Sequence, residues 1–561
     1  MILEGVGVSG GKAVGRLVLL SRVHDDANLP ETPVSLDEAL TRLTDAIAAS
    51  RDEIAVIAAA ARERIGADSA AIIEAQLLVL DDPEWYDPIV DDIRGGLAPE
   101  TAVWQTSEDV AAVLSALDDA YLRERASDIL DVAQRVVGHL TGRSRSAELS
   151  DLTGDVIIGA YELTPTDTLN LDLDVVRGII TEVGARTSHA AIIARQLGIP
   201  AVVAASGLMT SASPGVLVIV DGDRGECSFN PEQHDVDAAR AAASARSATV
   251  VITEQVTTRD GVAVSVLANA SSPQDVERAV AAGADGIGLF RTEFLFMQSD
   301  DLPDEARQVE FYGAVAAAAE GRPVTFRTLD VGGDKPLPGL PMPHEENPFL
   351  GVRGVRLTLQ HAEVFATQLR ALATTAERYP GISVMVPMIS GLEEIDDVRA
   401  MLAEVVPNAN FRFGTMVEVP STALLIRELI DEVDFLSVGT NDLTAYLLAA
   451  DRGNRELQYL YTEFHPAVVR VLAQIRQDAG TTPVSVCGEV AGDPRSLALL
   501  VGLGYQQLSV AGPLVPGIKQ RIRGLDATLV RPAVEALLRA SRHRHIEAAL
   551  LELGRLETDR S

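Results

Sequence analysis

The carboxy-terminal half of the chain repeats one pattern, a short apolar run followed by a helical period, and this repetition constrains its fold more than any other feature. Runs of this length between turn residues are typical of buried strands, and strands that alternate with helices build parallel sheets. A less regular eighth run lies near Leu350 to Val355. Eight such units in about 260 residues predict a (β/α)₈ barrel over residues 259–561. The seven clear runs are Val262–Leu267, Gly286–Phe290, Val324–Leu329, Ile382–Met388, Phe413–Val419, Phe435–Val438 and Val484–Val486.

Upstream of the barrel, the hydrophobic period changes twice. Closely spaced glycines and a short apolar run in residues 1–22 predict strands joined by tight turns. From Ser35, apolar residues recur at the three- and four-residue steps of a long amphipathic helix, and helical patterns continue to about Leu140. Asp81-Asp82-Pro83 ends one of these helices, and short strand patterns return from Asp155. The pattern therefore predicts an α/β domain that is interrupted by a helical bundle.

At 561 residues, the chain is too long to fold around a single hydrophobic core. We predict a multidomain α/β protein, in which a swivelling α/β domain carries an inserted all-helical bundle and a helical linker leads to the barrel. The predicted divisions are 1–22 with 145–228 for the α/β domain, 23–144 for the bundle, 229–258 for the linker and 259–561 for the barrel.

The charge and the cysteine content exclude several kinds of partner. With a formal net charge of -34, the chain offers no basic face to nucleic acid or to an anionic membrane, whereas a basic protein partner suits it. Two cysteines are too few for a disulfide framework, which indicates a reducing compartment. We recognise no leader sequence and no run of about 18 apolar residues, so we expect a cytoplasmic protein without membrane insertion.

Residues 184–195 (GARTSHAAIIAR) follow a short apolar run and lead into a helical pattern, which predicts a strand, a tight turn and the start of a helix. His189 would lie in the first turn of that helix, where free N–H groups and the helix dipole favour negative charge. A neutral imidazole is also a nucleophile near neutral pH. His189 is therefore a candidate phosphate carrier. Taken alone, a histidine that only caps the helix is the alternative.

Basic side chains end several of the predicted barrel strands. Arg291 and Arg327 follow two apolar runs, and Arg353 ends the segment that starts at Asn347. Because the carboxyl ends of barrel strands meet at one mouth, we expect these arginines to converge. Their planar guanidinium groups could hold a small ligand that carries both phosphate and carboxylate. For any single arginine, a surface ion pair is the alternative.

Acidic residues reach the same mouth from later strands. Glu418 ends one apolar run, Asn441 and Asp442 follow the next, and Arg452 comes ten residues after Asp442. Two carboxylates that leave positions open for water and substrate oxygens suit Mg²⁺. The alternative is a buried carboxylate pair that the arginines neutralise. Cys487 ends the last run; by itself, a cysteine in an apolar strand is most often core, and we interpret Cys227 in that way.

Several of these segments together resemble a known family. Residues 184–195 are similar to the phosphohistidine signature of the phosphoenolpyruvate-utilising enzymes, and residues 414–420 and 434–443 are similar to their second signature. Within that family, the whole chain resembles Enzyme I of the bacterial sugar phosphotransferase system. The resemblance implies that phosphoenolpyruvate phosphorylates His189, and that Cys487 protonates the departing enolate to give pyruvate.

The resemblance also implies partners and ligands. The phosphate would pass from His189 to a histidine of the small phosphocarrier protein HPr, which would dock on the helical subdomain, and the barrel domain would form a homodimer. Ala445 stands where the family usually has glutamine, so this chain differs at one secondary contact. The implied site residues are Glu418 and Asp442 for Mg²⁺, and Arg291, Arg327, Arg353, Asn441, Asp442 and Arg452 around phosphoenolpyruvate.

Other functions remain as alternatives. Pyruvate phosphate dikinase and phosphoenolpyruvate synthase need a large ATP-binding domain ahead of the histidine domain, and a nitrogen-related Enzyme I needs an additional sensory domain. Here about 150 residues precede the histidine domain, without a glycine-rich phosphate loop. A scaffold that does not turn over would leave the barrel residues unexplained, and a barrel lyase would leave His189 unexplained. Pyruvate release coupled to phosphorylation of His189 separates these functions.

Overall fold

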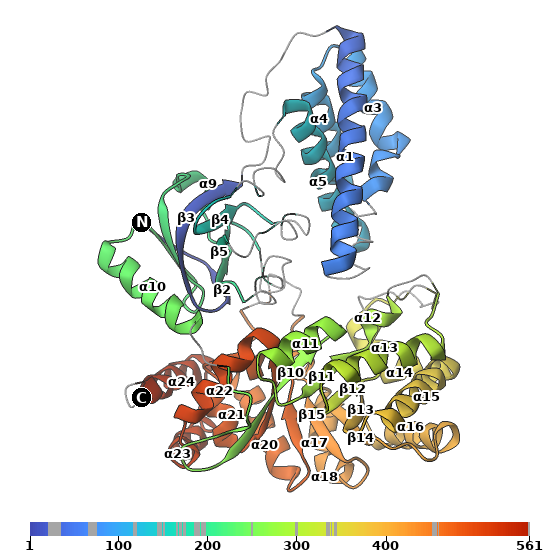
Figure 1. Ribbon diagram of the computed structural model, residues 1–561, viewed down its shortest axis with the longest axis vertical. Helices are drawn as coiled ribbons and strands as arrows, with labels where there is room; N and C mark the ends of the chain where they lie inside the picture. The colour runs from blue at the N-terminus through green and yellow to red at the C-terminus, as the bar shows by residue number, and fades with distance from the viewer. Residues whose placement is uncertain are drawn as a thin grey trace. The chain divides into compact units, whose positions relative to one another are not determined.

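The computed structural model forms two compact units, Met1–Ser247 and Ala248–Ser561 (Figure 1). The structure describes residues 1–20, 35–64, 76–115, 120–142, 152–163, 175–184, 198–247, 251–297, 301–332, 339–340, 345–451 and 459–558, together with the single residues 149, 167, 171, 191, 194, 337 and 457. Within these ranges, residues 59–64, 115, 120–128, 244–247 and 554–558 are described by their backbone alone.

The first unit contains a mixed β-sheet built from both ends of that unit. In the described residues, its strands lie in the order β1-β8-β7-β3-β4-β5-β6-β2. The pairs from β3 to β6 are parallel and the other pairs are antiparallel. The polypeptide therefore leaves this sheet after β3 and returns to it at β4. The strands are β1 (Ile2–Glu4), β2 (Val6–Ser9), β3 (Lys12–Leu20), β4 (Val156–Ala160), β5 (Val176–Thr181), β6 (Ala201–Val203), β7 (Leu217–Asp221) and β8 (Glu226–Phe229), with the short helix α9 (Leu208–Ser211) between β6 and β7.

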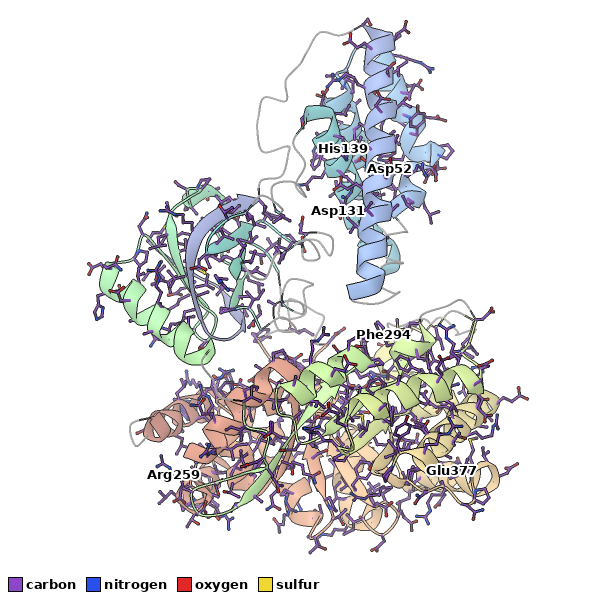
Figure 2. The ribbon with its side chains drawn as sticks, viewed as in Figure 1. Asp52, Asp131, His139, Arg259, Phe294 and Glu377 are labelled. Carbon is purple, nitrogen blue, oxygen red and sulfur yellow. The ribbon has the colours of Figure 1, made fainter. Side chains whose placement is uncertain are left out.

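Between β3 and β4, helices form a bundle around a core of their own. Trp85 lies in this core, and its indole N–H donates to the Ser107 hydroxyl at 2.8 Å. The ring of His139, labelled in Figure 2, lies 2.8 Å from the carboxylate of Glu53 on the neighbouring helix. The helices of the bundle are α1 (Leu36–Arg64), α3 (Pro83–Arg94), α4 (Pro99–Ser115) and α5 (Ala120–Thr141).

Side-chain caps set the starts of two helices in the bundle. The Ser35 hydroxyl accepts a hydrogen bond from the Glu38 N–H at the start of α1, as expected for a capping residue. The Asp82 carboxylate accepts from the Glu84 N–H at 2.9 Å, and Pro83 opens α3. Asp81-Asp82-Pro83 thus ends one helical segment and starts the next, α3. The sequence pattern predicted the end of the first helix but did not predict α3 as a separate helix. The same three residues serve as a stop and as an N-cap.

The second unit is a closed parallel barrel. In the described residues, eight strands follow one another from β10 to β17, and β10 pairs with both β11 and β17. The short strand β9 (Val256–Thr257) adds to β10 in the antiparallel sense. Each of the seven clear apolar runs of the sequence contains a strand. The barrel strands are β10 (Ala263–Ala270), β11 (Ile287–Arg291), β12 (Val324–Arg327), β13 (Ile382–Val386), β14 (Arg412–Val417), β15 (Phe435–Val438), β16 (Val484–Val486) and β17 (Gln507–Ala511).

The eighth strand is β17, so the prediction of a strand near Leu350 to Val355 was wrong. Pro348 opens a short 3₁₀ turn there, Leu350 is 65% exposed, and a helix begins at Val355. β17 was missed because Ser509 interrupts its apolar run. That serine is buried in the barrel, where its hydroxyl donates to Asn269 Oδ1 at 2.6 Å. A polar side chain is tolerated there because its hydrogen bond is satisfied.

Helices surround the barrel strands (Figure 1). None of the helices in the described part of the chain combines the length and the apolar character needed to cross a bilayer. The helices of this unit are α11 (Pro273–Ala281), α12 (Glu293–Phe296), α13 (Glu305–Ala318), α14 (Val355–Gln360), α15 (Ala362–Arg378), α16 (Leu392–Val405), α17 (Pro420–Leu424), α18 (Ile426–Leu429), α19 (Thr440–Leu448), α20 (Pro466–Asp478), α21 (Leu497–Leu503), α22 (Val515–Gly524), α23 (Ala527–Leu537) and α24 (His543–Thr558).

The helix within residues 229–258, α10 (Gln233–Ser247), packs on the sheet of the first unit. Its residues Val236 and Ala239 form a small buried cluster with Val14 of β3 and Ile219 of β7. The first compact unit accordingly includes this helix and ends at Ser247.

A buried lysine joins three segments of the barrel unit. Lys519 of α22 is fully buried, and its ammonium donates to the carbonyls of Ile252 and Glu254 at 3.1 and 2.9 Å. It also donates to Asp285 Oδ1 at 2.6 Å, while Asp285 Oδ2 accepts from the Val266 N–H at 2.7 Å. The lysine therefore holds the entry to β9 and the turn before β11 against α22.

We expect Lys519→Met to lower the free energy of unfolding by about 3 kcal/mol, because it leaves the Asp285 carboxylate, which is 12% exposed, without its cation. Denaturant unfolding of the full chain, followed by circular dichroism, measures the change. Arg521→Met, at an exposed position of the same helix, is the matched control and should change stability by less than about 0.5 kcal/mol. Equal stability of the Lys519→Met variant and the wild type would contradict this role.

Candidate active site at the barrel mouth

The ends of the barrel strands bring most of the predicted site residues to one mouth. All strands from β10 to β17 are parallel, so their carboxyl ends lie on the same side of the barrel. Phe294 of α12, labelled in Figure 2, follows β11 at this side. Arg291 and Arg327 end β11 and β12, Glu418 follows β14, Asn441 and Asp442 lie in the first turn of α19, and Cys487 follows β16.

Two of the arginines belong to a buried ion cluster made of Glu293, Arg327, Asp330, Arg353 and Asp442. Arg327 contacts Glu293 Oε1 at 2.7 Å and Asp330 Oδ2 at 2.8 Å. Arg353 contacts Asp330 Oδ2 at 3.1 Å and Asp442 Oδ2 at 3.3 Å. Burial lowers the pKa of Arg327, but Glu293 and Asp330 outweigh it and the net pKa is raised. Both guanidinium groups therefore stay charged and are held in place.

Sequence reasoning missed two members of this cluster, Glu293 and Asp330. Both follow a strand-ending arginine by two or three residues, Glu293 after Arg291 and Asp330 after Arg327. That spacing was the available signal. A carboxylate close behind an arginine at the end of a strand indicates that the mouth carries its own counter-charges.

A second buried network fixes the backbone where β12 ends. The Thr292 hydroxyl donates to the Arg327 carbonyl at 2.9 Å, and Gln368 of α15 donates to that hydroxyl at 3.1 Å. The Gln368 side-chain oxygen accepts from the Leu329 N–H at 3.0 Å. Because Gln368 is 1% exposed, these bonds are shielded from water and hold Arg327 at a defined position.

Glu418 is a buried carboxylate with unfavourable surroundings. It is 1% exposed, and its Oε1 accepts from the Met388 N–H at 2.7 Å. Burial first, and then the charges of Asp442 and Asp330, raise the pKa of Glu418, although Arg327 and Arg353 oppose this effect. Met388 has a left-handed φ of 61°, so the backbone donor of this bond is strained. A cation that binds beside such a carboxylate stabilises its charged form.

Cys487 is a protonated thiol at neutral pH. It is 4% exposed, and burial raises the pKa of its thiol to about 11. Its sulfur donates to the Val438 carbonyl at 3.4 Å. Leu289, Met385, Met416 and Phe435 form an apolar layer against it. The thiol can therefore give its proton to a basic carbon atom but is not a ready nucleophile.

The remaining predicted residues differ in their contacts and exposure, and two of them lie outside the described part of the chain. Asn441 Oδ1 accepts from the Glu489 N–H at 3.0 Å, which ties α19 to the loop after Cys487. Arg291 is exposed at the end of β11. Cys227 is fully buried among apolar residues of the first unit, as expected of a core cysteine. His189 and Arg452 lie outside the described residues.

Ala445 lies on α19 one residue before Tyr446. The Tyr446 hydroxyl donates to the Phe349 carbonyl at 2.5 Å, and the Arg353 guanidinium lies 6.0 Å from the centre of the Phe349 ring. The helix that carries Asp442 therefore also anchors the segment that precedes Arg353. An alanine at 445 leaves this anchor intact.

Comparison with known proteins decides the family. Three domains of the phosphoenolpyruvate-utilising enzymes match the chain: the N-terminal domain at residues 4–125, the mobile domain at 152–225 and the phosphoenolpyruvate-binding domain at 245–527. Phosphoenolpyruvate-protein phosphotransferase of Geobacillus stearothermophilus is 38% identical over 95% of this chain and 96% of that protein. Its Bacillus subtilis (strain 168) counterpart is 37% identical over 98% and 99%. The chain belongs to the phosphoenolpyruvate-protein phosphotransferase family.

This membership confirms the resemblance seen in the motifs, the multidomain α/β fold with a parallel barrel, and the enzyme class. A solution structure of Enzyme I is 34% identical over 44% of this chain and 99% of that chain, with a TM-score of 0.36. A phosphoenolpyruvate-protein phosphotransferase moves the phosphoryl group of phosphoenolpyruvate to a protein acceptor, and enzymes of the phosphoenolpyruvate-utilising family work with a divalent metal ion.

Gly488 has no room for a side chain, and we expect Gly488→Ala to displace Cys487. An added Cβ would lie 1.8 Å from Thr440 Oγ1 and 2.8 Å from Thr440 N. The variant should lose about 1–3 kcal/mol of stability and most of its phosphotransferase activity. Denaturant unfolding and initial rates of pyruvate formation measure the two effects.

The control for this experiment is Gly517→Ala in α22, where an added Cβ meets nothing within 4 Å. Gly488 has a φ of -78°, so the clash and not backbone strain is under test. A Gly488→Ala variant with the stability and the rate of Gly517→Ala would show that the loop can move without loss.

Proposed function

We propose that this phosphotransferase moves the phosphoryl group of phosphoenolpyruvate to its own His189 and then to a histidine of the phosphocarrier protein HPr. Pyruvate leaves, and the reaction is the first step of sugar uptake by the phosphotransferase system. The observation that supports the chemistry most is the gathering of arginines, two carboxylates and a protonated thiol at one barrel mouth.

The arginines of the mouth would bind phosphoenolpyruvate. Arg291, Arg327 and Arg353 offer planar donors for phosphate and carboxylate oxygens, and Asn441 and Arg452 would add further contacts. Arg327 Nε is buried and has no hydrogen-bond partner among the described atoms, which leaves a donor for a ligand. The carboxylates of the ion cluster would keep Arg327 and Arg353 preorganised for this substrate.

Glu418 and Asp442 would hold Mg²⁺. The donor set fits this ion, because Mg²⁺ prefers oxygen ligands and takes one or two carboxylates together with water and phosphate oxygens. Among the described residues, no group of three or more His, Cys, Asp or Glu side chains is arranged for a metal, so two carboxylates would leave the other positions to substrate and water. Bound Mg²⁺ would offset the negative charge that spreads over the transferring phosphoryl group.

Cys487 would complete the first half-reaction. As a ring nitrogen of His189 bonds to phosphorus, the bond from phosphorus to the C2 oxygen of phosphoenolpyruvate breaks and leaves enolpyruvate. The Cys487 thiol then gives its proton to C3, which yields pyruvate and a thiolate that regains a proton from solvent. Its raised pKa keeps the thiol protonated until the enolate forms.

The domains would divide the two half-reactions. The α/β domain of residues 1–22 and 145–228 would carry His189, the bundle of residues 23–144 would receive HPr, and residues 229–258 would be the linker about which the α/β domain swings. Because α10 packs on β3 and β7, this helix would move with the α/β domain. The barrel of residues 259–561 would form a homodimer, and the enzyme would act in the cytoplasm.

We expect the purified protein with Mg²⁺ and phosphoenolpyruvate, without ATP or acceptor, to release a burst of about one pyruvate per chain. An equal amount of acid-labile phosphate should appear on the protein, because His189 keeps the phosphoryl group when no acceptor is present. His189→Ala should abolish both signals, and added HPr should restore turnover. A protein that releases pyruvate without becoming phosphorylated would be a lyase, and one that releases none would be a scaffold.

We expect Glu418→Gln to slow the burst by about hundredfold or more, since the variant loses a charged oxygen at the metal site. A chelator should stop the wild-type burst, and Mg²⁺ should restore it. Glu428→Gln, at an exposed position of α18, is the matched control and should react like the wild type. A wild-type burst in the presence of excess chelator would rule out this use of the two carboxylates.

A further inference from the structure

The backbone of Cys487 leaves the barrel ladder at the point where β16 ends. Val486 is the last residue of β16 and pairs with Val438 of β15 and with Leu508 of β17. The Cys487 N–H still donates to the Val438 carbonyl at 3.0 Å. The Cys487 carbonyl, however, accepts from the side-chain amide of Asn269 at 3.2 Å. A side chain of β10, and not a neighbouring strand, therefore holds this carbonyl.

Asn269 reaches this carbonyl from the strand that closes the barrel. β17 lies between β10 and β16 in the sheet, so the Asn269 amide extends past β17 to reach Cys487. The register of β10 against β11 shifts between Ala268 and Asn269. Irregularities of this kind re-aim a side chain and are common next to active sites. The bond thus joins the first strand of the barrel to the loop that follows the seventh.

Groups at both ends of the Asn269 amide fix its orientation. Its Oδ1 accepts from the Ser509 hydroxyl at 2.6 Å, and Ser509 is fully buried. A flipped amide would set Oδ1 against the Cys487 carbonyl oxygen, and two acceptors cannot bond each other. Gly288 of β11 leaves room for the hydroxyl, because an added Cβ there would lie 2.5 Å from Ser509 Oγ. Only one orientation of the amide therefore satisfies both of its ends.

Two asparagines hold the main chain that carries the thiol. Asn269 holds the carbonyl at its start, and Asn441 Oδ1 accepts from the Glu489 N–H at 3.0 Å. Between these two bonds, Gly488 packs on Thr440, where an added Cβ would not fit. With the main chain fixed in this way, the side-chain torsion sets the place of the sulfur. Placement matters for the chemistry, because a shift of about 1 Å at a reacting group can cost about a hundredfold in rate.

We propose that Asn269, with its amide oriented by Ser509, is a positioning residue for Cys487 that sets the face of the enolate to which the thiol gives its proton. The inference rests on the proposed function. In that step the S–H bond breaks, the electron pair of the C2–C3 double bond forms the new C3–H bond, and C2 becomes a ketone. The S–H pair stays on sulfur, and solvent later returns a proton. Asn269 neither gives nor takes a proton, because its bond is to the Cys487 carbonyl.

The test follows the stereochemistry of one turnover by the full chain with Mg²⁺. Phosphoenolpyruvate that carries one deuterium at C3, as a single geometric isomer, reacts in tritiated water, and lactate dehydrogenase traps the pyruvate at once. A methyl group that gains tritium then holds three hydrogen isotopes and is chiral. The wild type should give one configuration, because the thiol approaches one face of the enolate.

Asn269→Ala should give a largely racemic methyl group and should slow pyruvate formation by about tenfold. The reason is that enolpyruvate that misses the thiol leaves the site and takes its proton in solution from either face. A purely structural defect would lower the amount of active enzyme and leave the configuration as it was. The configuration of the product therefore separates positioning from loss of folded protein.

Three further variants complete the test. Asn269→Asp still accepts from Ser509 but sets a carboxylate oxygen against the Cys487 carbonyl, so it should behave like Asn269→Ala. Ser509→Ala leaves the amide with one orienting partner and should lose part of the configuration, and it carries the test if the Asn269 variants do not fold. Ser265→Ala is the matched control near the amino end of β10, where the hydroxyl accepts from Gln255 at 2.8 Å, and it should match the wild type. A single configuration in every folded variant of Asn269 and Ser509 would overturn the inference.

A second measurement needs no substrate. In a Cys227→Ala background, Cys487 is the only thiol, and its alkylation by iodoacetamide reports how readily the thiol is reached. Asn269→Ala should speed alkylation by about threefold, because a thiol that is 4% exposed opens to solvent more often once its main chain loses an anchor. If the wild type makes no pyruvate, the proposed function is wrong, and this measurement alone decides whether Asn269 positions Cys487: an unchanged alkylation rate rejects it.

Discussion

The buried ion cluster at the barrel mouth is the constraint on which the rest of the site depends. Arg327 and Arg353 are removed from water, and each would be costly there without the carboxylates of Glu293, Asp330 and Asp442. In return, low exposure strengthens every contact they make and keeps their guanidinium groups in one orientation. A parallel barrel suits this arrangement because the ends of all its strands reach one mouth, and residues from different strands can neutralise one another.

Two ionisable groups in this mouth, Glu418 and Cys487, are buried in different environments. Glu418 lies among carboxylates and arginines, so a bound cation can balance its charge. Cys487 rests on an apolar layer, and burial raises the pKa of its thiol, so it keeps its proton at neutral pH. Burial raises the pKa of both groups, but the ionic surroundings of one suit the proposed metal binding, and the apolar surroundings of the other suit the proposed proton donation.

The bundle, the α/β sheet and the barrel each pack around a hydrophobic core of their own. The bundle packs around Trp85, the α/β sheet has its own clusters on its two faces, and the barrel unit has a third core. The proposed passage of His189 between two partners requires parts that move without unfolding, and domains with independent cores meet that need.

The sequence by itself determined the period of most elements and the chemistry at their ends. Seven barrel strands, most helices of the bundle and the candidates Arg327, Glu418 and Asp442 follow from local pattern, because period and turn residues are encoded within a few neighbours. The role of Cys487 came from the family resemblance, since local pattern alone predicts a core cysteine. Only the tertiary structure decided that β17 closes the barrel, and that Glu293 and Asp330 lie against the buried guanidinium of Arg327. The closure and the Glu293 contact depend on partners far away in the chain, and a buried polar residue such as Ser509 looks out of place in a strand until its partner is known.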